Sequence, residues 1–153
     1  MSEIRIRPQK EGDRNRLAEL SCLCFSGAPW FSAMSVEEKL RRHDDYRSRQ
    51  DAMIVVAVCG NQIVGAQIGF ALIAAPEIAR LLPCTKKGDY YICEGFVAEP
   101  YRGQGIAHRL RIAMDRWMKD QGFLRRIVRI STQSNLAALR RHGFRVVVEK
   151  AIK

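Results

Sequence analysis

The stretch that decides the fold is Tyr91–Met114, which reads YICEGFVAEPYRGQGIAHRLRIAM. Its first part, up to Ala98, is apolar along most of its length, as in a strand at the centre of a sheet. A basic loop with two glycines follows, and a helical pattern then begins. The apolar stripe of that helix consists of Ile106, Leu110, Ala113, Met114, Trp117 and Met118. We therefore predict a buried strand, a tight loop and an amphipathic helix in direct succession.

The loop between this strand and this helix has the composition of an anion-binding site. Unpaired amide N–H groups and the positive end of the helix dipole gather at a helix N-terminus. Gly103 and Gly105 let a phosphate approach the backbone, and Arg102 adds a fixed positive charge, so a pyrophosphate would fit there. A Rossmann fingerprint would need a third glycine at His108, and a Walker loop would need a Gly-Lys-Ser/Thr end. Taken alone, the two glycines equally suit an ordinary strand-to-helix turn.

The remaining residues alternate predicted strands and helices around this unit. Ser35 and Glu38 form a capping box, and Asp13 is placed to cap an earlier helix. That earlier helix carries leucines 17, 20 and 23 on one face, and the Gly60-Asn61 pair predicts a hairpin turn. The segment 76–88 is either a lid or a long connection. The predicted strands are 4–8, 52–59, 63–74, 90–98, 126–130 and 144–149, with a last helix over 135–142. This order predicts a single α/β domain over residues 1–153.

Charge is distributed unevenly along the 153 residues. The formal net charge is +10, from 26 basic and 16 acidic side chains. Residues 1–100 hold 13 of each kind, whereas residues 101–153 hold 13 basic and 3 acidic ones. An anionic partner is therefore expected after residue 100. With 47% hydrophobic and 27% charged residues, the composition excludes a disordered or collagen-like chain.

No segment of the sequence predicts a membrane span or an export signal. The longest apolar run, Phe70–Pro76, is far shorter than the roughly 18–20 residues that cross a bilayer. Met1–Pro8 alternates like a strand and lacks the order of a secretory signal. We therefore expect a cytoplasmic protein with reduced thiols. The spacing of its five cysteines and three histidines fits no metal site, so we expect no metal and buried structural thiols.

Residues Arg102–Ala107 resemble the acyl-coenzyme A signature R/Q-x-x-G-x-G/A of the GNAT superfamily of N-acetyltransferases. As in that family, the signature follows a strand, which here ends near Val97. Asn135 and the Gly143-Phe144 pair resemble the family's next motif, and the order of elements matches from Ile4 onward. The resemblance implies the GNAT acyl-CoA fold, an α/β (mixed α+β) domain with a central mixed, mostly antiparallel sheet flanked by helices.

The resemblance also implies roles for individual residues. The main chain of Phe96, Val97 and Ala98 would face the pantetheine arm of CoA, and a strand amide would polarise the thioester carbonyl. Asn135 would hydrogen-bond the pantetheine or orient the splayed strands, although it also suits a helix cap. The loop amides would hold the pyrophosphate, and these residues are Arg102, Gly103, Gln104, Gly105, Ile106 and Ala107.

Glu94 is the candidate catalytic base, because an amine must lose a proton before or during attack on the thioester. Burial in an apolar strand would favour its protonated form and raise its pKa toward the working range. Strand alternation places Glu94 on the face opposite Val97 unless a bulge intervenes. A carboxylate paired with an arginine is therefore the alternative, and Tyr91, Asp89 and a water relay stay open as the base.

The usual general acid of the family is missing from this sequence. Relatives carry a tyrosine shortly before the Gly-Phe pair, whereas the segment from Asn135 to Gly143 holds none. His142 would either replace it as a proton donor or cap the helix. Because the CoA thiolate is a good leaving group, loss of the acid would slow the reaction rather than abolish it.

Together these residues predict an acetyl-CoA dependent N-acetyltransferase, which transfers an acetyl group to a primary amine of a small molecule or peptide by direct attack in a ternary complex. A catalytically silent acyl-CoA binder and a basic nucleic-acid binding module are the alternatives, although no RNA-binding or zinc-finger motif occurs. The family's acceptor pocket would involve residues 25–31 and 76–88, whose few acids do not favour a polyamine. We expect no membrane partner and leave a homodimer open.

Overall fold

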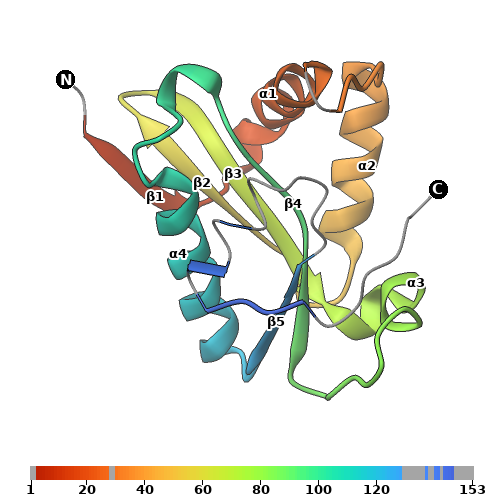
Figure 1. The fold of residues 1–153 in the computed structure, drawn as a ribbon. Helices are drawn as coiled ribbons and strands as arrows, with labels where there is room; N and C mark the ends of the chain where they lie inside the picture. Colours follow the sequence, from red (N-terminus) through yellow and green to blue (C-terminus); the bar gives the residue numbers. More distant parts are fainter. Residues whose placement is uncertain (1–2, 28–29, 129–136, 138–139, 142, 147–153) are drawn as a thin grey trace.

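The computed structural model describes residues 3–27, 30–128, 137, 140–141 and 143–146 (Figure 1). The predicted order of strands and helices is confirmed from the first strand to β5, and the segment 76–88 begins with the short helix α3. The elements are β1 (Ile4–Pro8), α1 (Arg14–Ser26), α2 (Val36–Ser48), β2 (Met53–Cys59), β3 (Gln62–Ala71), α3 (Pro76–Ala79), β4 (Asp89–Val97), α4 (Ile106–Asp120) and β5 (Arg125–Val128).

The five strands of the described residues form one mixed sheet in the order β1-β2-β3-β4-β5 (Figure 1). Strands β1 to β4 pair antiparallel, and β5 pairs parallel with β4. This confirms the predicted mixed, mostly antiparallel sheet. The Gly60-Asn61 turn joins β2 to β3 as a hairpin, with Cys59 opposite Gln62.

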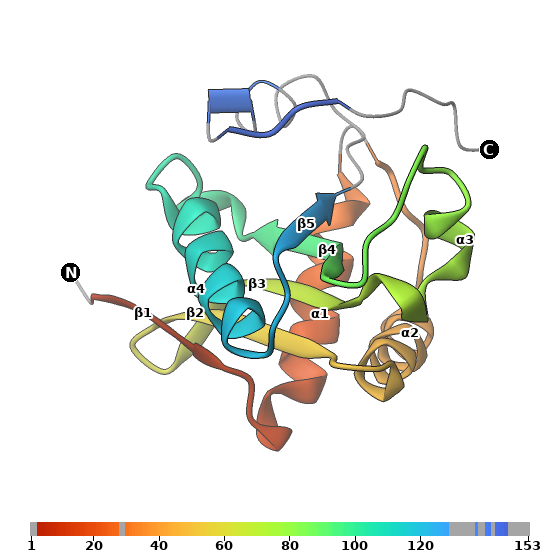
Figure 2. The ribbon, with the colours of Figure 1, turned by 90° about the horizontal axis from the view of Figure 1, so that it is seen from below.

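Helices cover both faces of this sheet (Figures 1 and 2). Helix α1 packs on one face through Leu17 and Leu20, and α2 lies on the same side. Helix α4 packs on the other face through its buried stripe, which consists of Ile106, Leu110, Met114 and Met118. Because β2 and β3 are covered from both sides, they are buried along nearly their whole length.

Three predictions for helix positions are wrong. The Asp13 carboxylate does not cap α1, because it accepts a backbone N–H of the preceding turn and pairs with Arg7 at 2.7 Å. Leu23 is exposed and Cys24 takes its place in the core, since a spacing of three residues drifts off one face of a helix with 3.6 residues per turn. Trp117 is also largely outside the core of α4, with 42% of its surface exposed.

The second helix begins as predicted, and the thiols differ from the prediction. The Ser35 hydroxyl caps α2 by accepting the backbone N–H of Glu38 at 3.1 Å. No disulfide joins the five cysteines to one another, but only Cys24 is buried, and Cys84 is exposed. In the described part of the chain, no helix is long and apolar enough to cross a bilayer.

The C-terminal predictions are tested only in part. Residues 137, 140 and 141 are helical, in agreement with the predicted last helix. Residues 144–146 have no regular structure, although the closing strand was expected to begin there. Asn135, His142 and residues 147–149 lie outside the described residues.

Gly65 of β3 allows β4 and α4 to approach closely. A Cβ atom there would lie 2.9 Å from the carbonyl oxygen of Phe96 and 3.5 Å from Leu110 Cδ1. We expect Gly65→Ala to lower the free energy of unfolding by about 1–3 kcal/mol, measured by urea denaturation. Gly12→Ala is the matched control, since a Cβ at Gly12 has no atom within 4 Å. Equal stability of the two variants would contradict this account of the contact.

Candidate active site

Strand β4 is paired along one edge, and on its other edge the pairing among the described residues ends at Ile92. Strand β5 pairs with β4 only over Asp89–Ile92, so from there to Val97 no strand among the described residues covers that edge. On the other edge β3 pairs with β4 from Tyr90 to Val97 except at Cys93, and the Ala98 amide donates to the Val64 carbonyl of β3 at 2.7 Å. Because successive residues of a strand direct their amides to alternate edges, the amides of Gly95 and Val97 face the open edge. Among the described residues, these two main-chain donors therefore have no strand partner.

The glycine loop lies at the end of this open edge. Arg102 Nε donates to the Val97 carbonyl at 2.8 Å, which ties the loop to β4. Gly103 and Gly105 have φ values of 78° and 77°, and a Cβ at either position would meet no atom within 4 Å. Gly105 is the N-cap residue of α4 and supplies no side-chain acceptor to its first amides. The first turn of α4 therefore presents N–H groups to an outside acceptor.

The residues predicted to line the pantetheine arm differ in how their side chains pack and in the edge that their amides face. Phe96 packs its side chain under α1, and Val97 packs on the α4 face. The Ala98 amide is used within the sheet, so Val97 is the predicted residue whose amide faces the open edge. Gly95, which is exposed, joins it. Sequence analysis missed Gly95, although a step of two residues back from Val97 would have found it.

Glu94 lies in a buried polar cluster between β4 and the helices α1 and α2. The side chain of Ser21 donates a hydrogen bond to Glu94 Oε1, and His43 Nε2 lies 3.0 Å from the same oxygen. Lys39 Nζ, which is also buried, lies 3.6 Å from Oε2. The carboxylate is thus held by these three side chains rather than by an arginine. No group of three or more His, Cys, Asp or Glu side chains that could hold a metal ion occurs in the described residues.

These contacts shift the pKa of Glu94 in the direction opposite to the one expected. Burial raises it, but the hydrogen bond and attraction of His43, the Lys39 ammonium and the Ser21 hydroxyl outweigh burial and hold the pKa below its ordinary value. The expectation of a pKa raised toward neutrality is therefore wrong. Glu94 is an ionised, charge-paired carboxylate at neutral pH, and its role as a base stays a prediction.

A β-bulge decides the direction of the Glu94 side chain. Ile68 of β3 is opposite Glu94, whereas the next residue of β3 is opposite Ile92, so Cys93 is the extra residue. Cys93 and Glu94 consequently both face the α1 and α2 side of the sheet. The bulge precedes Glu94 and does not lie between it and Val97. The two side chains therefore stay on opposite faces, as strand alternation predicts.

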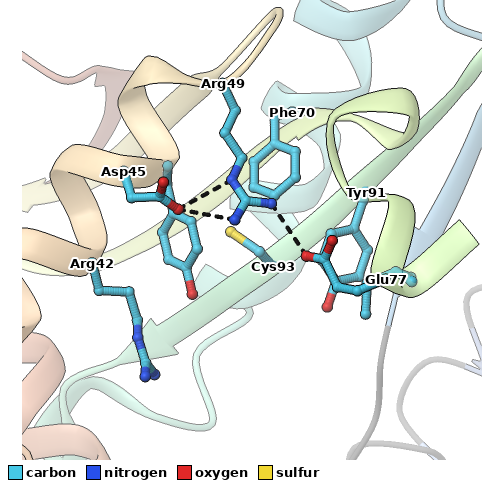
Figure 3. A pocket seen from close by; sticks show the side chains of 9 residues that line it. Arg42, Asp45, Arg49, Phe70, Glu77, Tyr91 and Cys93 are labelled. Atoms are coloured by element: carbon cyan, nitrogen blue, oxygen red, sulfur yellow. Dashed lines mark hydrogen bonds and ion pairs between the residues drawn. The ribbon is translucent and has the colours of Figure 1, made fainter.

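A cavity of about 250 Å³ opens between α2, α3 and the sheet, beside this cluster (Figure 3). Three aromatic rings form its apolar wall, and four charged side chains reach into it. Of the segments expected to build an acceptor pocket, 76–88 contributes two residues and 25–31 contributes none. The cavity reaches Cys93, two residues or about 7 Å along the strand from Gly95. Its lining consists of Arg42, Asp45, Tyr46, Arg49, Phe70, Glu77, Ile78, Tyr91 and Cys93.

The alternative candidate bases are placed differently. Tyr91 lines the cavity, on the same side of the sheet as Glu94. Asp89 is buried at the start of β4, where its carboxylate accepts the backbone N–H of Lys86 at 2.8 Å. Tyr91 therefore faces space that an amine can occupy, whereas Asp89 is engaged in a local turn.

The Cys93 thiol in the cavity is poorly suited to be a nucleophile. Burial raises its pKa well above the ordinary value, and the nearby charge of Glu94 raises it further. The thiol also donates to the Ile68 carbonyl, with an S···O distance of 3.5 Å. Because the thiolate is the reactive form, this environment disfavours an acyl-cysteine intermediate.

One basic side chain in the last third of the chain forms contacts within the protein. Arg126 pairs with Asp115 at 3.1 Å and lies over the ring of Phe144, 4.2 Å from its centroid. Arg140 and Arg141 are exposed. Arg126 therefore has an internal role that the sequence did not predict.

Comparison of the sequence with known families gives one match. A model described as the Acetyltransferase (GNAT) family matches residues 14–144, which include every described element from α1 to β5. A search of curated proteins found no match. The family match therefore rests on the pattern of the whole domain rather than on one near relative.

Solved structures share the fold at low sequence identity. Aminoglycoside N-acetyltransferase AAC(6')-Iy, in complex with the bisubstrate analogue CoA-S-monomethyl-acetylneamine, is 16% identical, with a TM-score of 0.72 over 99% of this chain and 97% of that chain. An acetyltransferase of Trypanosoma brucei is 21% identical, with a TM-score of 0.69 over 99% and 98% of the two chains. A protein of Bacillus halodurans C-125 described as a transcriptional regulator is 17% identical, with a TM-score of 0.75 over 99% of both chains.

Glu94→Gln should change how stability depends on pH. Because folding lowers the pKa of Glu94, its ionised form stabilises the protein above the ordinary value of 4.5, and this contribution is lost as the pH falls through the folded value. We expect the variant to be about 3–5 kcal/mol less stable near pH 7, since the buried Lys39 loses its partner, and the gap to close below pH 4.5.

Urea unfolding between pH 3 and pH 7 measures this gap. Glu99→Gln, which removes an exposed carboxylate five residues further on, is the matched control and should show little difference from the wild type. A Glu94→Gln gap that is absent at pH 7, or that widens in acid, would refute the assignment of Glu94 as an ionised, stabilising group.

Proposed function

Because the chain belongs to the GNAT family of acetyltransferases, we propose that it transfers the acetyl group of acetyl-CoA to a primary amine by direct attack in a ternary complex. The observation that carries this proposal is the open edge of β4. The glycine loop lies at the end of that edge, and the cavity opens beside it on the α2 side. A thioester and an amine can therefore approach the same main-chain amides from different directions.

The pyrophosphate of CoA is proposed to bind at the N-terminus of α4. The amides of residues 102–107 donate to it, and the helix dipole favours its negative charge. Exposure of the loop and the positive φ of Gly103 and Gly105 support this role, since neither glycine carries a side chain that would hold a phosphate away. Asn135 is proposed to contact the pantetheine arm.

The thioester carbonyl is proposed to accept hydrogen bonds from the amides of Gly95 and Val97. The Ala98 amide is already bound within the sheet, whereas these two face the open edge. The amine nitrogen attacks the carbonyl carbon, the C–S bond breaks with its electron pair going to the CoA sulfur, and the amine gives up a proton. Fixed donors that stabilise the developing oxyanion are each worth about 3–4 kcal/mol in such reactions.

Glu94 is the proposed acceptor of that proton. Its lowered pKa keeps it ionised at neutral pH, and it precedes Gly95 directly in the strand. Because helices α1 and α2 enclose it, the proton would reach it through His43 or a water molecule. Tyr91, in the cavity wall, is the alternative proton acceptor. The CoA thiolate leaves without the tyrosine acid that other family members use.

Gly105→Ala should weaken CoA binding. A residue with a side chain strains the φ of 77°, and its methyl group would lie where a phosphate approaches the backbone. We expect the Kd for CoA to rise at least about tenfold in isothermal titration calorimetry. Gly122→Ala at the other end of α4 is the matched control, since Gly122 also has a positive φ, of 94°, and open space around it. Equal affinity of the two variants would remove the loop from the CoA site.

Release of free CoA thiol tests the transfer reaction itself. With acetyl-CoA and a panel of primary amines, we expect the initial rate to depend on the identity of the amine. CoA binding with the same background rate for every amine would identify a silent acyl-CoA binder. No CoA binding, together with salt-sensitive binding of nucleic acid, would favour the nucleic-acid alternative.

A further inference from the structure

Of the two arginines that line the cavity beside β4, only Arg49 pairs with the cavity's two acids. Arg49 binds Asp45 through Nε at 3.1 Å and Nη2 at 2.9 Å, and its Nη1 lies 3.3 Å from Glu77 (Figure 3). Both acids of the cavity are thus paired with one arginine. Arg42 is exposed, and no ion pair joins it to another described residue. Its guanidinium is therefore available to an anionic group of a ligand.

The position of Arg42 along the cavity follows from its neighbours on α2. Lys39 and His43, one helical turn apart, both contact Glu94, which is the residue before Gly95. Because Arg42 directly precedes His43 in the helix, its backbone lies beside the same part of β4 as that of His43. The positive charge is therefore at the end of the cavity nearest the open edge.

The opposite end of the cavity is aromatic. Arg49, about two helical turns further along α2, lies over Phe70, 4.9 Å from the ring centroid. Phe70 is opposite Tyr91 in the sheet, and the two rings meet edge to face at 5.7 Å. Tyr46 adds a third ring, 5.9 Å from Phe70. This aromatic wall suits a flat apolar group that packs against it.

We propose that the acceptor is a free α-amino acid with an aromatic side chain. Its ring packs in the cavity against the wall that the three aromatic residues form, its carboxylate pairs with Arg42, and its amine points toward the thioester carbon beside Gly95. The side chain, the carboxylate and the amine all branch from the α-carbon. They can therefore point in three directions: into the cavity, toward Arg42 and toward the edge of β4. The volume of about 250 Å³ lies just below the roughly 300–1,000 Å³ of drug-sized sites, which suits one amino acid. This inference rests on the proposed transfer function.

The same charges disfavour a polycationic amine of the aminoglycoside kind. Asp45 and Glu77 each already pair with Arg49, which weakens their attraction for a second ammonium group. Arg42 would repel such a group at the mouth of the cavity. The acceptor therefore differs in charge from the neamine part of the analogue bound to AAC(6')-Iy.

The test compares matched acceptors by thiol release. L-phenylalanine is set against phenethylamine and phenylalaninamide, which lack the carboxylate, and against neamine as the polycation. We expect kcat/KM for phenylalanine to exceed that of each other amine at least about tenfold. Arg42→Ala should lower the phenylalanine value by about ten- to a hundredfold and leave phenethylamine within about twofold. Arg41→Ala, an exposed neighbour outside the cavity lining, is the matched control and should change neither.

The outcomes separate this inference from the proposed function. Faster turnover of phenethylamine or neamine, or an equal loss with both substrates in Arg42→Ala, would overturn the amino-acid proposal and leave acetyl transfer intact. Turnover of no amine would contradict acetyl transfer. In that case calorimetric titration of phenylalanine into the CoA-saturated protein decides: binding that Arg42→Ala abolishes supports the site, and no binding overturns it.

Discussion

Up to Ile92, strand β4 is hydrogen-bonded on both edges, and from there to Val97 only β3 pairs with it among the described residues. Backbone N–H groups at the centre of a fold need partners, and an interrupted ladder leaves them to water or to a ligand. Among the described residues, the end of this pairing coincides with an exposed glycine and lies near the N-terminus of α4, the proposed pyrophosphate site. The proposed reaction depends on the stretch of β4 from Gly95 to Val97, because its amides are the fixed donors that the thioester and the amine are proposed to approach from two sides.

The buried charged cluster around Glu94 positions α2, the helix on the side from which the acceptor is proposed to approach β4. Glu94 connects β4 to α1 through Ser21 and to α2 through Lys39 and His43. Since α2 also carries Arg42 and Tyr46, the cluster fixes the helix that forms one wall of the cavity. Removing one partner from such a pair leaves an uncompensated buried charge, so the cluster holds α2 in register with the strand.

Sequence reasoning reached the strand–loop–helix unit and the hairpin because both depend on local signals. Hydrophobic periodicity identified β4 and α4, and a Gly-Asn pair identified the turn. The cavity depended on long-range packing instead. The bulge at Cys93, which turns Cys93 and Glu94 to the same side, has no signature in the sequence. The predicted direction of the Glu94 pKa shift was wrong for the same reason, since Lys39 and His43 belong to a mostly polar helix whose sequence does not show that these two side chains are buried.

Amide hydrogen exchange, followed by NMR, tests the central claim most directly. In the free protein the amides of Gly95 and Val97 should exchange faster than that of Ala98, which is bonded to Val64. Saturating acetyl-CoA should slow both of the fast amides, because the thioester and pantetheine arm then accept their hydrogen bonds. Slow exchange at Gly95 and Val97 in the free protein, or no change with acetyl-CoA, would contradict the account of β4 as the meeting point of two substrates.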